Sequence, residues 1–213
     1  MSKDAGEVCG VKWLRIAFAT KNAHKVAEAN RVLKSYGIEL YPAPIEKLEI
    51  QSDSLEEIAL VAARHAYREL GKPVVVEDSG LFIEELKGFP GPYSSYVYKT
   101  IGLKGVLKLL EGCSNRRAYF KAAVAIALRE DFVKVFTGVV YGTISYEARG
   151  TYGFGFDPIF VPEGYSATFA ELGEEVKCRI SHRAKAFKAL GAWLSSNKQL
   201  LSPNSLSDDS GGE

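Results

Sequence analysis

Two acidic residues directly follow a run of valines, in the segment Glu77-Asp78-Ser79-Gly80. Val74–Val76 is typical of a buried strand, and we expect that strand to end at these four residues. Adjacent carboxylates at the C-terminal end of a strand commonly face a crevice in open α/β sheets. Hard oxygen ligands of this kind suit Mg²⁺, which completes its shell with water and substrate phosphates. Taken alone, the segment is equally typical of an acidic turn.

Positive charge gathers at a predicted helix start, in Thr20-Lys21-Asn22-Ala23-His24-Lys25. Backbone N–H groups at a helix N-terminus attract anions, and Lys21 and Lys25 add charge there. The segment is not a Walker loop, because no Gly-x-x-x-x-Gly-Lys-Ser/Thr occurs in the chain. The alternative interpretation is a capped turn with solvated lysines. The segment is therefore a candidate cradle for phosphate.

Two further segments carry groups that could contact a nucleotide. Phe154-Gly155-Phe156-Asp157 places two aromatic rings around a glycine, either as core residues or as a platform on which a base stacks. Lys177 and Ser181-His182-Arg183 offer N–H donors to a carbonyl or a phosphate. His182 and Arg183 would occupy the first turn of a helix capped by Ser181, where the helix dipole opposes positive charge. The pattern fits a structural role for this pair as well as a binding role.

The apolar periodicity predicts the elements that must hold these groups. Leu14–Ala19 is typical of a buried strand, and an amphipathic helix follows Thr20–Lys25. We expect a helix at about Tyr96–Leu110, interrupted by Gly102 and Gly105, and three antiparallel strands between Ala118 and Tyr146. Helices and strands alternate early in the chain, whereas strands cluster later. This order predicts an α/β fold built on a mixed sheet.

Composition and charge exclude several classes of function. Lys and Arg number 27 against 26 Asp and Glu in 213 residues, so the formal net charge is +1 and we expect no nucleic-acid partner. Three cysteines without a CxxC pair favour a reduced, cytoplasmic setting. We find no signal peptide and no apolar run that could span a membrane. We expect one domain over residues 13–196, between a flexible extension (1–12) and a disordered tail (197–213).

The order of the motifs resembles the inosine/xanthosine triphosphate pyrophosphatases, which clear non-canonical purine nucleotides. The resemblance covers about Ile16 to Leu194 and rests on five motifs in family order. They are Thr20-x-Asn22-x-x-Lys25, Glu77-Asp78-Ser79-Gly80-Leu81, Gly88-Phe89-Pro90-Gly91-Pro92-Tyr93-Ser94, Phe154-Gly155-Phe156-Asp157-Pro158-Ile159-Phe160, and Lys177 followed by Ile180-Ser181-His182-Arg183. Each motif alone is a weak signal, whereas five in order are specific.

The resemblance implies a role for each motif. Thr20, Asn22 and Lys25 would hold the triphosphate, with Lys21, Ala23 and His24 in the same loop. Asp78 would accept a proton and share Mg²⁺ with Glu49, and Ser79 would touch the substrate. Glu77 stands where many relatives carry Asp, and it is a further candidate metal ligand. The base and sugar would lie against Phe154, Gly155, Phe156 and Asp157, and Lys177, His182 and Arg183 would contact phosphate or base.

The implied fold is an elongated mixed sheet flanked by helices, with two lobes around a deep central nucleotide-binding cleft, in a homodimer. The implied reaction is hydrolysis of ITP, dITP or XTP to the monophosphate and pyrophosphate, which removes these nucleotides from the pool. A nucleotide sensor without hydrolysis is an alternative of another class, although a sensor would not need a base such as Asp78. A pyrophosphatase for modified pyrimidine triphosphates is a third, in which the His182–Arg183 pair would have less purpose.

Overall fold

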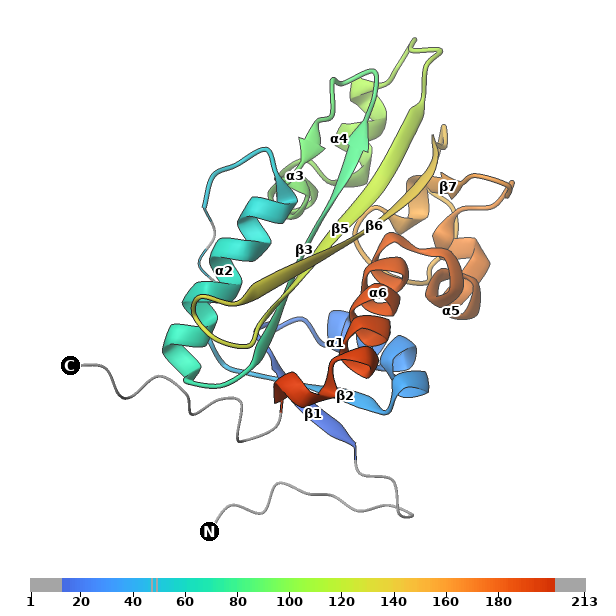
Figure 1. Ribbon diagram of the computed structural model, residues 1–213. Coiled ribbons are helices and arrows are strands. Elements are labelled where there is room, and N and C mark those ends of the chain that lie inside the picture. The colour runs from blue at the N-terminus through green and yellow to red at the C-terminus, as the bar shows by residue number, and fades with distance from the viewer. Residues whose placement is uncertain (1–12, 47, 49, 202–213) are drawn as a thin grey trace, which may run out of the picture.

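A curled mixed β-sheet forms the centre of the protein in the computed structural model, which describes residues 13–46, 48 and 50–201 (Figure 1). Within these residues the strand order is β2-β1-β3-β5-β6-β7, and β4 pairs with β3. β1 is parallel to β2 and β3, whereas the other pairings are antiparallel. The strands are β1 (Leu14–Phe18), β2 (Ile38–Pro42), β3 (Val74–Ile83), β4 (Pro90–Gly91), β5 (Arg117–Ala127), β6 (Val133–Ile144) and β7 (Phe160–Pro162). The mixed α/β sheet expected from the sequence is confirmed.

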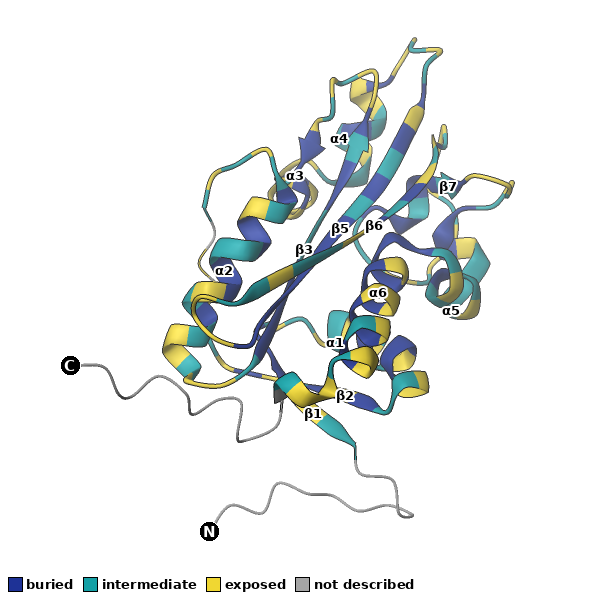
Figure 2. Cartoon of the chain, in the orientation of Figure 1, coloured by how far each residue is buried: buried dark blue, intermediate teal, exposed yellow. Residues whose placement is uncertain are grey.

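Helices cover both faces of the sheet because successive side chains of a strand point to opposite faces. In β3, Val75 packs with α1 (Ala23–Leu33) and α6 (His182–Ser196). Val74 and Val76 pack instead with α2 (Leu55–Leu70) on the other face. The dark blue stripe of buried residues along β3 and β5 in Figure 2 marks this double burial.

A third apolar cluster extends the core beyond α6, and it is built from shorter elements. Leu81 and Ile83 of β3 pack there with Val97 and Val106. The elements that supply this cluster are α3 (Ser94–Thr100), α4 (Gly102–Leu109), the 3₁₀ helix η2 (Asp157–Ile159), β7 and α5 (Phe169–Ile180). These elements place the Phe154–Asp157 segment beside the first turn of α6.

Two expectations about single strands are wrong. β3 does not end at Glu77–Gly80 but continues to Ile83, so the acidic pair lies inside a strand. The region expected to hold three strands forms two long ones, β5 and β6, paired in continuous register. The break expected at Gly102 in the Tyr96–Leu110 helix is confirmed: the chain divides there into α3 and α4, and the φ of Gly102, 62°, is one that an L side chain rarely adopts. No break occurs at Gly105, which lies inside α4.

The described chain continues past residue 196, where we expected the domain to end. After α6, residues Lys198–Leu201 form the 3₁₀ helix η3, and Leu200 packs against the cluster shared by α1 and α6. A further 3₁₀ turn, η1 (Lys34–Tyr36), joins α1 to β2. None of the helices in the described residues combines the length and the apolarity needed to cross a membrane.

Candidate functional site

A pocket of about 950 Å³ opens where one edge of β3 lacks a neighbouring strand. β5 pairs with β3 along its whole length, from Val74 to Ile83. On the opposite edge, β1 pairs only with Val74 and Val75, and β4 only with Leu81 and Phe82. Among the described strands, nothing pairs with the edge between these two contacts. Glu77 and Asp78 therefore line the pocket although they belong to the central sheet.

Most of the residues that the sequence singled out line this one pocket. They are Thr20, Lys21, Asn22, Lys25, Glu77, Asp78, Ser79, Phe154, Gly155, Phe156, Asp157, Lys177, His182 and Arg183. Ala23 and His24 belong to the first turn of α1 beside the pocket but do not line it. Glu49 lies outside the described residues. Segments far apart in the sequence thus meet at the edge of β3.

Arg183 is the centre of a buried ion-pair network. It is 3% exposed, and its Nε atom donates to Glu77 Oε1 at 3.1 Å. Its Nη1 atom donates to Glu28 Oε2 at 2.5 Å, and Nη2 donates to Ser79 Oγ at 3.0 Å. Glu77 Oε2 faces Lys25 Nζ at 2.5 Å. Both oxygens of Glu77 are thus held by cations.

A second branch of the network runs through Lys177. Its ammonium group, 2% exposed, lies 2.7 Å from both Glu28 Oε1 and Asp157 Oδ2. Burial alone would raise the pKa of Glu28, but the charges of Arg183 and Lys177 outweigh it and hold that pKa below its ordinary value. Three carboxylates and three cations therefore neutralise one another at the floor of the pocket.

Glu28 is the member of this network that the sequence analysis missed. It stands three residues after Lys25 on α1, so the two side chains share a helix face. An acidic residue on that face, one turn before the core residue Val32, is the signal that could have found it. Without it, Arg183 and Lys177 would be two buried cations with too little negative charge between them.

His182 shows how two basic residues can occupy a helix start. Burial lowers the pKa of His182 well below its ordinary value, and the charge of Arg183 lowers it further, so the imidazole is neutral at pH 7. Its ring stacks on Phe120 with centroids 4.8 Å apart. The first turn of α6 packs closely against Gly138 of β6, where a Cβ would collide with the His182 carbonyl oxygen. Within the described residues, Nδ1 of His182 has no hydrogen-bond partner although it is buried.

Asn22 caps α1, as the alternative interpretation of this segment anticipated. Its Oδ1 atom accepts from the backbone N–H of His24 at 3.0 Å and from that of Lys25 at 3.4 Å. Thr20 Oγ1 in turn accepts from the backbone N–H of Asn22 at 3.1 Å. Two N–H groups that we expected to face an anion are therefore occupied by the cap. Lys25 reaches into the pocket and Lys21 is exposed at its rim.

Phe154 is held between two glycines in the loop before η2. Gly153 and Gly155 have φ values of 84° and 62°, and a Cβ at Gly153 would collide with Asp157 Oδ2. That oxygen accepts from the backbone N–H of Phe154 at 2.8 Å. The nitrogen of Lys177 lies 4.5 Å from the centre of the Phe154 ring, within the range of a cation–π contact. The loop thus places an aromatic ring at the pocket wall.

The carboxylates of the pocket fit a hard divalent cation that also binds substrate oxygens. Asp78 and Glu46 both line the pocket, and Asp78 lies on the α2 face of β3, away from Arg183. No three His, Cys, Asp or Glu side chains in the described residues are close enough together to form a complete metal site. Mg²⁺ needs only one or two carboxylates when phosphates complete its octahedron. The donor set therefore matches a metal that arrives with a phosphorylated ligand.

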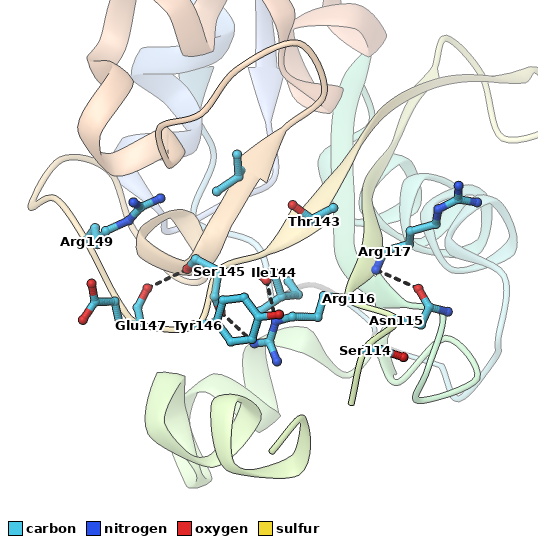
Figure 3. Close-up of a pocket in the computed structure, with 11 residues that line it drawn as sticks. Ser114, Asn115, Arg116, Arg117, Thr143, Ile144, Ser145, Tyr146, Glu147 and Arg149 are labelled. Carbon is cyan, nitrogen blue, oxygen red and sulfur yellow. Dashed lines mark hydrogen bonds between the residues drawn. The ribbon is translucent and has the colours of Figure 1, made fainter. Parts of the chain in front are cut away.

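A second pocket, of about 680 Å³, lies at the ends of β5 and β6 and contains none of the predicted site residues (Figure 3). Its one buried cation, Arg116, donates to the carbonyl oxygens of Leu110, Ile144 and Ser145 at 2.7–2.9 Å. Tyr146 covers its guanidinium at 4.5 Å. These contacts join the chain before β5 to the end of β6, so the role of Arg116 is structural.

Sequence comparisons identify relatives of this chain. The model of the Ham1 family matches residues 16–193. A dITP/XTP pyrophosphatase of Pyrobaculum aerophilum is 57% identical over 188 residues, which cover 88% of this chain and 100% of the relative. One of Hyperthermus butylicus is 55% identical over 179 residues, covering 84% and 94%.

A solved structure shows the same similarity in three dimensions. The HAM1 protein from Coxiella burnetii superposes with a TM-score of 0.78 at 33% identity, over 86% of this chain and 99% of that protein. The matching family model and the nearly complete coverage of these relatives show that this chain belongs to the Ham1 family.

Proposed function

We propose that this protein hydrolyses dITP, ITP and XTP to the nucleoside monophosphate and pyrophosphate. The observation that carries the proposal is the pocket at the open edge of β3, which joins carboxylates, buried cations and an aromatic face. The relatives named dITP/XTP pyrophosphatase support the substrate class. The resemblance further implies that the enzyme acts in the cytoplasm and that it is a homodimer. Size-exclusion chromatography with light scattering would test the homodimer.

The triphosphate would enter along the Thr20–Lys25 segment. Lys25 pairs with Glu77 of β3, and its side chain is 19% exposed whereas that of Glu77 is fully buried. An incoming phosphate would share this ammonium with Glu77, and Lys21 at the rim would attract the anion from solvent. The Asn22 cap holds the backbone so that the Lys25 side chain points into the pocket.

Asp78 is the residue that we propose as general base for the attacking water. It lies at the pocket wall on the face of β3 that carries no partner for Arg183. Glu77 is unsuited to this role, because Arg183 and Lys25 hold its pKa far below its ordinary value against the opposing effect of burial. Both of its carboxylate oxygens already face these two cations, so Glu77 is also a weaker candidate metal ligand than Asp78. Asp78 and Glu49 would hold Mg²⁺, which would neutralise phosphate charge and orient the α-phosphate.

Purine selectivity would arise from donors that face the 6-position. Hypoxanthine and xanthine carry a 6-keto acceptor there, whereas adenine carries an amino donor. Arg183 uses three of its five N–H groups on Glu77, Glu28 and Ser79, which leaves two for a ligand. His182 lines the same pocket, and its neutral imidazole can donate one N–H to a keto oxygen. A 6-amino group would leave such donors unpaired, at a high free-energy cost in a buried site.

Pyrophosphate release tests the proposal directly. The substrates are dITP, ITP, XTP, GTP, ATP and dTTP, each measured with Mg²⁺ and with EDTA. We expect rapid Mg²⁺-dependent release from the first three and slow release from ATP and dTTP. Binding of ITP without any release would identify a sensor. A preference for dTTP would indicate the pyrimidine reaction instead.

A further inference from the structure

The first turn of α1 sends two consecutive side chains to two different parts of the pocket. Lys25 reaches inward to Glu77 of β3. His24, which is exposed and does not line the pocket, instead lies on the ring of Phe154. The two ring centroids are 5.5 Å apart and the planes are inclined by 26°, which is a stacked arrangement. One helical turn therefore contacts both the carboxylate strand and the aromatic wall.

Phe154 needs such a contact because its own backbone restrains it little. It stands between Gly153 and Gly155, and its backbone bonds to Asp157 alone: its N–H donates to Oδ2, and its carbonyl oxygen accepts from the Asp157 N–H at 3.4 Å. Its ring is half-buried and lies 4.5 Å from Lys177 Nζ and 5.3 Å from Arg183 Cζ. We call Lys177 and Arg183 the buried cation pair. These cations attract the face of the ring, and a stacked neighbour adds van der Waals contact with a second aromatic plane.

We propose that His24 is a positioning residue for the base: its imidazole stacks on Phe154 and holds that ring in place over the buried cation pair. The inference rests on the proposed function, in which Phe154 forms the wall for the purine. The imidazole of His24 then acts through Phe154 and not on the phosphates. Of the two neighbours at the helix start, Lys25 serves the triphosphate and His24 serves the base.

Steady-state kinetics with ITP distinguish this role from phosphate binding. The His24→Ala variant should raise KM about two- to tenfold, the range of one lost aromatic pair, with little change in kcat. The His24→Phe variant keeps a ring and should recover most of that loss. His65→Ala makes the same substitution on α2, at a residue that does not line the pocket, and serves as the matched control with no change expected. A thermal melt of each variant confirms the fold.

Two competitive inhibitors distinguish binding of the base from binding of the triphosphate. Inosine carries the base and sugar alone, and its inhibition should weaken in His24→Ala and recover in His24→Phe. Tripolyphosphate carries the charge alone, and its inhibition should be the same in wild type and both variants. Weaker tripolyphosphate inhibition in both variants would show that His24 is a phosphate ligand and would overturn the inference.

A double-mutant cycle tests the pairing itself. In a Phe154→Leu background, which has no ring to stack on, adding His24→Ala should change KM less than about 1.5-fold. Independent, multiplying effects of the two substitutions would overturn the inference while leaving the proposed function intact. Failure of the wild type to release pyrophosphate from any purine triphosphate would overturn the proposed function, and this inference with it. The two failures are therefore distinguishable.

Discussion

The carboxylates of Glu77 and Asp78 lie on opposite faces of β3 although the residues are adjacent in sequence. Glu77 is held by Arg183 and Lys25 on the α1–α6 face. Asp78 is paired in the sheet with Ala123, which packs with α2 on the other face. Only at the open edge of β3 can both side chains line one pocket. This arrangement separates a carboxylate that neutralises buried cations from one that can act on a ligand.

Replacing Asp78 by Asn should abolish turnover and spare the fold. The amide has nearly the same shape but cannot accept a proton, and a lost general base costs about 10²- to 10⁴-fold in kcat. Pyrophosphate release from ITP measures the loss, and a thermal melt should show nearly unchanged stability. Turnover within about tenfold of the wild type would remove Asp78 from the chemistry.

Replacing Glu77 by Gln should mainly destabilise the fold. The change leaves Lys25 and Arg183 with less negative charge in a buried setting, which costs about 3 kcal/mol or more of the free energy of unfolding. Urea denaturation measures this cost. The matched control is Glu56→Gln, whose partly exposed pair with Lys121 should contribute less than about 1 kcal/mol. Equal losses in the two variants would contradict the buried network.

The Glu77–Gly80 segment also shows where sequence reasoning fails. Asp and Gly, and to a lesser degree Glu, are depleted in strands, so local preference predicts that β3 ends there. Pairing with β5 across the whole length of β3 satisfies its backbone, and two cations neutralise Glu77, so tertiary contacts override that preference. Most of the residues that type and spacing singled out do line the pocket, although they make up fewer than half of its lining. Type and spacing cannot predict that Glu28 joins Arg183, because that contact depends on how α1 and α6 pack together.

The sequence analysis also did not predict the helix α5, although its start has a clear local signal. Thr168 and Glu171 form a capping box, in which Thr168 Oγ1 accepts from the Glu171 N–H and the Glu171 carboxylate accepts from the Thr168 N–H. This pattern marks the start of α5, which carries Lys177. The non-helical Gly173 inside α5, with a φ of 76°, interrupts the periodicity by which a helix is recognised.

The contribution of Glu28 to the free energy of unfolding should decrease at acid pH. Its folded pKa lies below the ordinary value of 4.5, so its contribution is fully present above that value and is lost as pH falls through the folded pKa. At pH 7 the wild type should therefore be more stable than Glu28→Gln, and the gap should narrow progressively below about pH 4.5. Urea denaturation at about pH 6.5 and about pH 3.5 measures the gap. A gap of equal size at both pH values would show that the charge of Glu28 is not the stabilising property.

Replacing Lys25 by Ala should weaken triphosphate binding and reduce its dependence on salt. The substitution removes a charge that faces the pocket, and interactions between charges weaken as ionic strength rises. The KM for ITP, measured between about 50 and 300 mM NaCl, gives both the strength of binding and its dependence on salt. The Debye length falls from about 14 to about 6 Å over this range. Lys21→Ala removes an exposed lysine from the same segment and should have the smaller effect. If KM and its salt dependence match the wild type, Lys25 serves only Glu77.

Selectivity for the purine base is best tested at Arg183 with a substitution that keeps the charge. Arg183→Ala would leave Glu77 and Glu28 without their shared buried partner and could unfold the protein. Arg183→Lys retains the positive charge but loses the fork of N–H donors that lets one side chain bind two glutamates and still reach a base. One lost charge-assisted hydrogen bond is worth about 1.5–3 kcal/mol, so kcat/KM for ITP should fall about ten- to a hundredfold.

The decisive quantity for Arg183→Lys is the ratio of kcat/KM for ITP to that for ATP. A disturbed pocket would lower both substrates together and leave the ratio unchanged, whereas loss of a donor to the 6-keto group lowers ITP alone. We therefore expect the ratio to fall toward unity, and we expect His182→Ala to lower it as well, because His182 lines the same pocket. If the ratio is preserved in both variants, this pair does not read the base. Selectivity would then have to come from the aromatic wall of Phe154–Asp157.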